Sequence, residues 1–438
     1  MAEPTTVEEK KNEKVSVVIR RFPHCKVELD ASVGPVMIKI AQEQALKDIK
    51  KEVSIPGFRK GKAPTEMIVK NYSRSIQDRA KEILADVAFK AALDLVQIPL
   101  LNNNAPVQFS SQKLSDNEGI FTFIYESEPI VPEIKPDNFQ LKSIDSTTPG
   151  EKELNEAVRQ LQLFYAQWHL VTDRPIQEGD FVILDLRTME DPPQQVFSDT
   201  RFEVTDASMA KWMKKMVLGK KAGISIEGIS EPDPELPEAK KKEFQPKRVL
   251  LTIKKIETAE IPPLTEEFAK KVGAKDVEHM KKYLADMLEK KTKEKIDHDK
   301  REQVNEYLLS FPMEIPLSLI HKEKEHRRKQ YAEDPRYQAK LQVMTDLQRD
   351  MEKLELEEAL QEQSESAVKL FYASRQIVRD AKINVTYQDV EAEAVRSLKA
   401  FGPVGIQSHM IPDELFALTL SKIILAKAQD YILNKNIA

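Results

Sequence analysis

Two proline-rich breaks constrain the fold of this 438-residue chain more than any other feature. The first covers residues 128–136, with prolines at 129, 132 and 136, and the second is the triplet 261–263. Proline cannot continue a helix, and runs rich in it form extended linkers. The hydrophobic pattern also changes at each break, so the chain is expected to form several domains, roughly two to four for this length.

The part before the first break has the pattern of a compact α+β domain. Residues 15–19, 25–29 and 120–125 are predicted strands, and two apolar stripes between them predict helices. The stripes consist of Leu46, Ile49 and Val53, then Ile76, Ile83, Leu84, Val87 and Ala91. Residues 1–14 are polar and charged, and we expect them to be a disordered tail. The domain is therefore predicted over residues 1–132.

Three further segments follow. Residues 151–170 predict a helix within a linker segment, 133–172. Residues 173–258 predict a small, mostly β domain, with strands at 181–186 and 249–253 and a proline-bearing loop at 232–246. Residues 259–438 predict a helical domain, with Pro316 at a helix start and a highly charged run over 322–358. Its stripes are Met280, Tyr283, Leu284, Met287 and Leu288, then Phe416, Leu420, Ile423, Ile424 and Tyr431.

Composition excludes several classes of protein. Only 12 glycines occur, and neither a GxGxxG nor a phosphate-loop pattern is present. The net charge of −5 gives no global indication of nucleic-acid binding. Cys25 is the single cysteine, so no intrachain disulfide can form and a reducing, cytoplasmic setting fits. The first residues lack the apolar core of a signal peptide, and we expect no membrane partner because no segment reaches the roughly 18–20 apolar residues of a span.

One loop stands out by its charge. Residues 47–81 carry ten basic and four acidic side chains, a local excess of six positive charges that favours polyanions such as rRNA. Phe58 lies between a turn glycine and two cations, Arg59 and Lys60, and an apolar anchor ringed by charge suits a small docking surface. Charge and turn chemistry alone leave open an ordinary solvated turn with Phe58 tucked into its own domain.

Residues 57–64, Gly-Phe-Arg-Lys-Gly-Lys-Ala-Pro, resemble the signature of the trigger factor family of ribosome-docked bacterial chaperones. The resemblance extends to Tyr72, to residues 222–223 and 264–268, and to Ile315-Pro316. It implies a multidomain α+β fold: an α+β ribosome-binding domain, an FK506-binding-type, mostly β middle domain and an all-α C-terminal domain with arms, on which the linker segment 133–172 packs. The tail before Val15 is longer than the family leads us to expect.

By this resemblance, Phe58, Arg59 and Lys60 bind the large ribosomal subunit beside the exit tunnel, touching a ribosomal protein and rRNA. Nascent and unfolded polypeptides are the other implied partners, held without ATP in a cradle framed by the arms, and a weak homodimer off the ribosome is left open. Such a chaperone needs many weak, adaptable contacts, which dispersed Met, Leu and Phe side chains supply. Each of these side chains can equally be a core residue.

The resemblance makes residues 173–258 a prolyl isomerase domain, whose pocket would lower the roughly 18–20 kcal/mol rotation barrier by binding the twisted X-Pro bond. The candidate pocket residues are Leu186, Phe197, Met209, Trp212, Met213 and Val217. Leu186 and Met213 stand where the family has aromatic residues, and Trp212 stands where it has glycine. We therefore expect weak activity, although Trp212 could itself form the pocket floor. An enzyme with substrate-delivery arms is the alternative function, and an envelope chaperone is a third.

Other candidate chemistry is sparse, and we expect neither a cofactor nor a metal. His321 and His326 are five residues apart, which puts them on different helix faces. Cys25 beside His24 could be a nucleophile, but a small buried strand residue is the simpler interpretation. Asp185 could act as a general acid, but no partner carboxylate pattern surrounds it.

Overall fold

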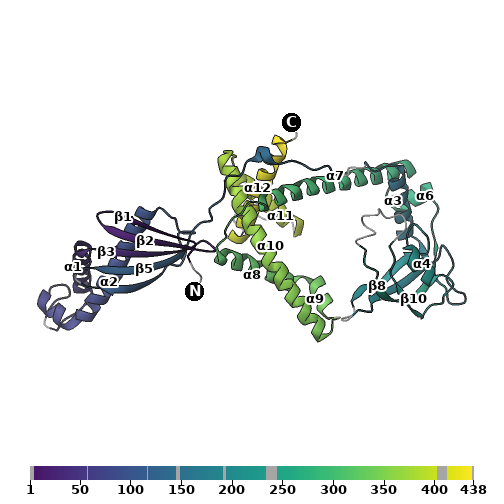
Figure 1. The fold of residues 1–438 in the computed structure, drawn as a ribbon. Coiled ribbons are helices and arrows are strands. Elements are labelled where there is room, and N and C mark those ends of the chain that lie inside the picture. The colour runs from purple at the N-terminus through teal and green to yellow at the C-terminus, as the bar shows by residue number, and fades with distance from the viewer. Residues whose placement is uncertain are drawn as a thin grey trace. The chain divides into compact units, whose positions relative to one another are not determined.

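The computed structural model describes residues 4–56, 58–115, 117–144, 148–190, 194–232, 244–342, 344–401 and 412–436. The chain divides into two compact units, one of Met1–Ser143 with Asp299–Ala438 and one of Ile144–His298. Helices and antiparallel sheets both occur, so the expected multidomain chain of mixed α and β structure is confirmed (Figure 1). None of the described helices is long and apolar enough to cross a membrane.

The first unit begins with a five-stranded antiparallel sheet of order β1-β2-β3-β5-β4. Its strands are β1 (Thr6–Lys11), β2 (Val15–Phe22), β3 (Lys26–Val33), β4 (Gln108–Leu114) and β5 (Gly119–Glu126). Buried and partly exposed residues alternate along β2 and β3, because successive side chains of a strand point to opposite faces. The three strands predicted in this region are confirmed, to within a few residues at their ends.

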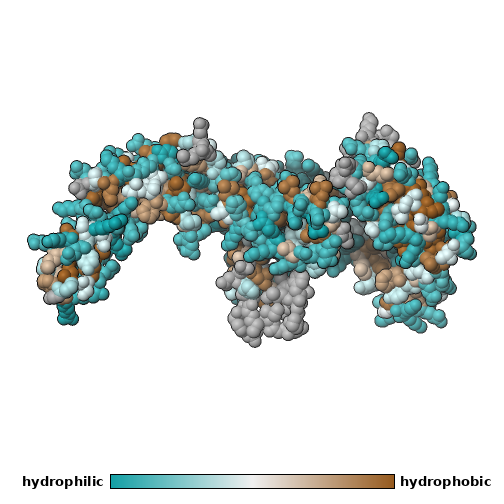
Figure 2. Space-filling model, turned by 90° about the horizontal axis from the view of Figure 1, so that it is seen from below, coloured by the Kyte–Doolittle hydropathy of each residue, from teal (hydrophilic) through white to brown (hydrophobic). Residues whose placement is uncertain are grey.

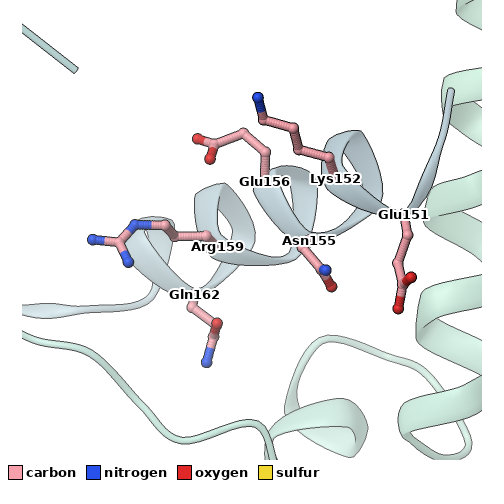
Figure 3. Close-up of a pocket in the computed structure, with 6 residues that line it drawn as sticks. All are labelled: Glu151, Lys152, Asn155, Glu156, Arg159 and Gln162. Carbon is pink, nitrogen blue, oxygen red and sulfur yellow. The ribbon is translucent and has the colours of Figure 1, made fainter. Parts of the chain in front are cut away.

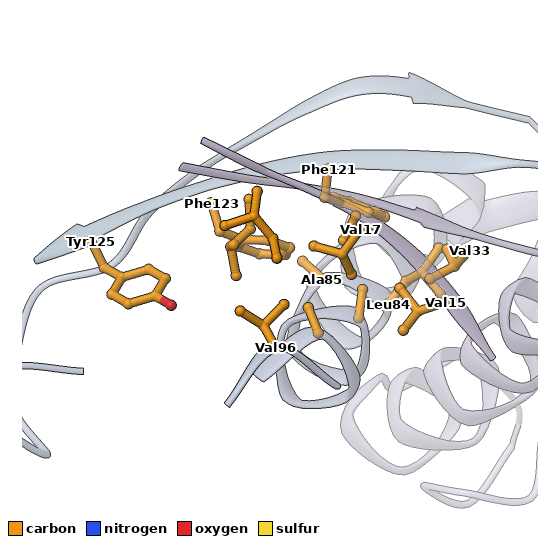
Figure 4. Packing of buried hydrophobic residues seen from close by; sticks show 14 of the residues in the cluster. Val15, Val17, Val33, Leu84, Ala85, Val96, Phe121, Phe123 and Tyr125 are labelled. Atoms are coloured by element: carbon orange, nitrogen blue, oxygen red, sulfur yellow. The ribbon is translucent and has the colours of Figure 1, made fainter. Parts of the chain in front are cut away.

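Helix α2 (Thr65–Val96) packs against the apolar face of this sheet, and the first turns of α1 (Pro35–Glu52) join the same main core (Figure 4). Ala85, Ala88 and Ala92 give α2 a smooth buried stripe that packs in one cluster with Phe121 and Phe123 of β5. Burial of each large side chain stabilises the fold by roughly 1.5–3 kcal/mol. Both predicted helices are confirmed, because their apolar stripes have the helical period.

The N-terminal tail differs from its prediction. Residues 6–11, expected to be disordered, form the edge strand β1, which pairs with β2 in the register Thr6↔Arg21 to Lys11↔Ser16. All six residues of β1 are exposed, so no buried side chain marks the strand in the sequence. The pairing relies on backbone hydrogen bonds, and the Lys10 ammonium also donates to the carbonyl of Val96 at the end of α2, at 3.4 Å. Residues 1–3 of this tail lie outside the described residues.

The rest of the first unit is helical. Its helices are the end of α7 (Val277–Leu309), α8 (Leu317–Glu333), α9 (Pro335–Gln342), α10 (Asp346–Asp380), α11 (Tyr387–Phe401) and α12 (Asp413–Lys435). Pro316 is the N-cap of α8, next to the predicted first-turn position. The charged run over 322–358 spans α8, α9 and the start of α10, where Arg328 binds Glu357 with two hydrogen bonds of 2.8 Å.

The proline-rich linker packs onto these helices. It contains the short 3-10 helix η1 (Pro136–Asn138), and Ile134 and Phe139 are buried in one cluster with Val304 and Ile432. The Tyr307 hydroxyl donates to the carbonyl of Lys135 at 2.7 Å. The linker is therefore part of the helical core rather than a free tether.

The second unit contains a sheet of order β6-β10-β7-β8, with β9 also paired to β10. Its elements are α3 (Glu151–Phe164), β6 (Gln167–Leu170), β7 (Phe181–Thr188), β8 (Gln195–Glu203), α4 (Lys211–Val217), β9 (Ser225–Ile229), β10 (Arg248–Glu260) and α6 (Glu266–Lys271). The helix predicted over 151–170 is therefore too long. It ends at Phe164, and residues 167–170 instead pair with the end of β10, a non-local partner that a local pattern cannot reveal. Most of the proline-bearing loop predicted at 232–246 lies outside the described residues.

A small helical cluster closes this unit beside the sheet. Val158 of α3 is buried together with Phe268 and Ala269 of α6 and Met280 of α7. The side-chain amide of Gln162 donates to the carbonyl of Pro262 at 2.8 Å. The chain therefore enters the sheet after α3 and leaves it before α6 at neighbouring points.

Candidate functional site

The charged loop between α1 and α2 is held at both ends by buried side chains. Ile55 and Ala63 are 7% and 6% exposed, whereas Phe58 between them is 40% exposed. Two turns shape the loop, because the Phe58 N–H donates to the carbonyl of Ile55 at 3.1 Å and the Lys62 N–H to that of Arg59 at 2.9 Å. The alternative in which Phe58 is tucked into its own domain does not hold for this geometry. Gly57 of the motif lies outside the described residues.

The two buried ends of the loop belong to a small core of their own. Ile49, Ile55, Ala63 and Ile68 form it, and further apolar side chains pack against it. These further side chains are Leu46, Val53, Tyr72 and Ile76. The sequence alone assigned no role to Ile55 or Ala63. The signal that could have found them is a single apolar residue on each side of a polar, glycine-containing turn.

The cations of the loop have no side-chain partners among the described residues. No ion pair or side-chain hydrogen bond joins Arg59, Lys60 or Lys62 to any residue that the structure describes. All three side chains are exposed. Unpaired cations beside an exposed aromatic ring can bind an anionic surface and insert the ring into an apolar pocket of a partner.

The six candidate isomerase residues are brought together, but in a core. Leu186, Met209, Met213 and Val217 are at most 5% exposed and form one hydrophobic cluster under the second sheet. Phe197 and Trp212 are half-buried and pack against the same cluster. Leu186 pairs directly with Phe197 across β7 and β8. Four of the six side chains thus have little surface left for a substrate.

Asp185, the candidate general acid, is held as a carboxylate. Its oxygens accept hydrogen bonds from the Asp199 N–H at 2.7 Å and the Ser198 hydroxyl at 3.1 Å, and the Lys254 ammonium lies 2.9 Å away. Burial alone would raise the pKa of Asp185, but these hydrogen bonds outweigh it and hold the pKa below its ordinary value. An ionised carboxylate at neutral pH cannot donate a proton, so the geometry argues against that role.

Cys25 lies outside a strand, contrary to the simpler interpretation of its sequence context. It occupies the turn between β2 and β3 with a left-handed φ of 57°, and its thiol donates to the carbonyl of Glu314 at 3.2 Å. Burial raises the pKa of the thiol to about 12, so it is protonated and a poor nucleophile. Across the described residues, no group of three or more His, Cys, Asp and Glu side chains could hold a metal ion.

A polar hollow on α3 is also visible in the second unit. It is lined by Glu151, Lys152, Asn155, Glu156, Arg159 and Gln162. Figure 3 shows these side chains projecting from a single helix in different directions. Groups that do not converge from several elements cannot enclose a small molecule, so we assign this hollow no binding role.

Comparison with known proteins agrees with the signature loop. The family model described as "Bacterial trigger factor protein (TF)" matches residues 15–161, and the model of the C-terminus of the same family matches residues 276–433. The two ranges together cover well over half of the chain. The chain belongs to the trigger factor family. The charged loop between α1 and α2 lies within the first matched range, and the second sheet lies between the two.

Trigger factors of chlamydial bacteria are among its relatives. The trigger factor of Protochlamydia amoebophila is 28% identical over 88% of this chain and 87% of the relative. The trigger factor of Chlamydia pneumoniae is 25% identical over 97% of this chain and 96% of the relative. A solved structure of a trigger factor chaperone, reported for its promiscuous substrate recognition, covers 98% of this chain and 99% of its own at 17% identity, with a TM-score of 0.49.

Proposed function

We propose that this trigger factor is a ribosome-associated, ATP-independent chaperone that acts in the cytoplasm. It docks beside the exit of the nascent chain through Phe58, Arg59 and Lys60, and contacts both a ribosomal protein and rRNA. The observation that carries this proposal is the exposed loop, whose cations pair with no described residue and whose two ends are fixed in a small core. A preorganised loop loses little conformational entropy on binding, which favours affinity.

The shielding of nascent chains is supported by exposed apolar side chains on the helical part. Leu347, Met351 and Leu354 are 67%, 41% and 66% exposed and follow one face of α10 at spacings of four and three residues. On the face seen in Figure 2, apolar residues are scattered among hydrophilic ones. Dispersed apolar contacts of this kind bind unfolded segments weakly and without strict sequence preference.

Ribosome co-sedimentation tests the docking assignment. We expect replacement of Phe58, Arg59 and Lys60 together by alanine to abolish co-sedimentation, with a stability change within about 0.5 kcal/mol per site because the side chains are exposed. Wild-type binding should fall steeply as salt rises if phosphates are contacted. A matched control removes one exposed aromatic ring and two exposed cations elsewhere in the same domain, by the substitutions Phe109→Ala, Lys113→Ala and Lys14→Ala. This control should sediment like the wild type. Equal sedimentation of the loop variant would refute the assignment.

A prolyl isomerase with delivery arms is the competing function, and we propose that its activity here is weak or absent. Leu186 and Met213 stand where the family has aromatic walls, and both are buried. Two lost aromatic contacts are expected to lower the rate on the order of a hundredfold. A protease-coupled assay on the wild type should therefore be nearly blank, and Trp212→Gly should raise the rate if the indole obstructs the pocket. Substantial wild-type activity that Trp212→Ala destroys would instead make Trp212 the pocket floor.

A further inference from the structure

The first domain of this chain contains two separate cores. The main core lies between the sheet and the helices and includes Ile38 of α1 and Leu84 of α2. The second, which we call the tip core, comprises the buried residues Ile49, Ile55, Ala63 and Ile68 with the side chains packed against them. The two clusters share no residue, although α1 and α2 contribute to both. The loop is therefore carried by a small unit joined to the main body only by two helices.

One of these two connections is interrupted. Within α2, Tyr72 has φ −128° and ψ 26°, outside the helical region, so the run Thr65–Val96 is two helices that meet at this residue. Ile68, before the break, belongs to the tip core, and Leu84, after it, belongs to the main core. A break in the hydrogen-bond ladder is a recognised cause of a helix kink. The bend at Tyr72 thus sets the direction of the first part of α2 relative to the rest.

Tyr72 also contacts the loop that the tip core carries. Its side chain packs against the tip core, and its hydroxyl donates to the carbonyl of Ser54 at 3.5 Å. Ser54 directly precedes Ile55, the buried residue at the start of the loop. The same side chain therefore connects the bend in α2 with the point where the loop begins.

We propose that Tyr72 is a positioning residue that fixes the direction of the docking loop, and that the tip core opens and closes independently of the main core. This proposal rests on the docking function proposed above for Phe58, Arg59 and Lys60. Docking requires the ring and both cations to be presented together. When only a fraction of the molecules presents them in this way, the apparent affinity falls by that fraction.

Two substitutions separate the contributions of the side chain. Tyr72→Phe removes only the hydroxyl that reaches Ser54, and Tyr72→Ala also removes the ring from the tip core. Tyr125→Phe is the matched control, because Tyr125 is buried in the main core and donates to the carbonyl of Ile98 at 3.2 Å. Each variant is measured in the full chain by ribosome affinity, thermal midpoint and hydrogen exchange.

We expect Tyr72→Ala to weaken ribosome binding roughly tenfold, the change that about 1.4 kcal/mol produces, and Tyr72→Phe to weaken it less. Amides of residues 53–68 should exchange faster than those of β2, β3 and β5 in the wild type, and faster still in Tyr72→Ala, while the strand amides are unchanged. Tyr125→Phe should lower the thermal midpoint and leave the affinity of the folded protein unchanged.

The outcomes distinguish this proposal from the docking function. If Tyr72→Ala binds ribosomes with wild-type affinity while the triple loop variant does not bind, the positioning role is refuted and the docking function stands. If the amides of the strands and of the tip core exchange at the same rate in every variant, the tip core does not open independently of the main core. A wild-type protein that binds no ribosomes would refute docking, and the exchange data would still decide whether the tip core opens by itself.

Discussion

A single glycine controls the backbone of the loop between α1 and α2, for which we propose the docking role. Gly61 has φ +82°, a value that residues with a Cβ rarely adopt. The nearest atom to a Cβ added there is the carbonyl oxygen of Lys50 at 4.0 Å, so space is available and the obstacle is conformational. Pro56 and Pro64 further restrict the ends of the loop.

We therefore expect Gly61→Ala to destabilise the domain by roughly 1 kcal/mol and to weaken ribosome binding, because the loop must leave its left-handed turn or bear the strain. Chemical denaturation and co-sedimentation measure the two effects. Gly34→Ser is the matched control. Gly34 is the N-cap of α1 with φ −87°, so serine there should add a few tenths of a kcal/mol, roughly the usual gain over glycine. A loss of stability in the control and not in Gly61→Ala would contradict this account.

One carboxylate on α10 links stability to pH. The hydrogen bond from Arg328, followed by that from Lys324, lowers the pKa of Glu357 from 4.5 to about 2. A carboxyl group with a depressed pKa stabilises the fold fully above its unfolded pKa, and the contribution disappears as pH falls towards the folded value. Glu357 therefore loses its contribution to stability as the pH falls from 4.5 to about 2. Because Glu357 is 39% exposed, solvent screening keeps its contribution modest.

We expect Glu357→Gln to be less stable than the wild type above pH 4.5 and to approach it as the pH falls to about 2. Unfolding midpoints over a pH series measure the difference. Glu362→Gln on the same helix serves as the control, because Glu362 is exposed and makes no ion pair with a described residue. A difference between Glu357→Gln and wild type that does not change with pH would show that the pairing is not what stabilises the helices.

At the scale of elements, β1 covers the edge of β2. The paired strand β2 has the sequence VSVVIRRF, whose apolar residues would make an exposed edge prone to association. In contrast, β1 exposes Glu8, Glu9, Lys10 and Lys11. Charges on an outer strand discourage pairing between molecules.

Removal of residues 1–12 should therefore lower the thermal midpoint only slightly, because no side chain of β1 is buried, and should cause concentration-dependent association relative to the full chain. Light scattering and circular dichroism measure the two effects. Lys10→Ala in the full chain tests the hydrogen bond to Val96 alone and should not cause association. A shortened chain that associates no more than the full chain would show that β1 is not a protective edge.

At the scale of the whole molecule, the second sheet behaves as an insertion. Strand pairing extends it over residues 167–260, because β6 pairs with the end of β10. The predicted boundaries, 173 and 258, would cut through that pairing. The hydrogen bond between Gln162 and Pro262 means that a short linker can join the two ends.

We expect a chain with residue 166 joined to residue 261 by a short flexible linker to keep suppressing aggregation of a denatured client. The docking loop, the small helical cluster around Phe268 and the C-terminal helices all lie outside the deleted range. Light scattering of the client with and without the shortened chain measures the activity. A variant that lacks residues 173–258 should be less soluble, because it keeps β6 but removes most of β10, the strand with which β6 pairs. Complete loss of holding activity in a folded 166–261 variant would assign the chaperone surface to the sheet.

The sequence alone determined the features that depend on neighbouring residues. The apolar stripes of α1, α2, α7 and α12 repeat every 3.6 residues, and the alternation in β2 and β3 repeats every two residues. Both periodicities can be recognised within a short stretch of sequence. The turn between α1 and α2 was also predictable, because its proline and glycine residues act locally, whereas its local charge left open whether Phe58 is exposed.

Tertiary structure decided what depends on distant partners. The strand β6 exists because β10, about 90 residues along the chain, offers its backbone groups, and β1 exists because β2 offers an edge, although every side chain of β1 is exposed. The burial of Leu186 and Met213, and the separation of the tip core from the main core, likewise follow from which helices and strands meet. Hydrogen bonding between strands and the filling of a core are properties of assembled elements, so no local pattern of residues could contain them.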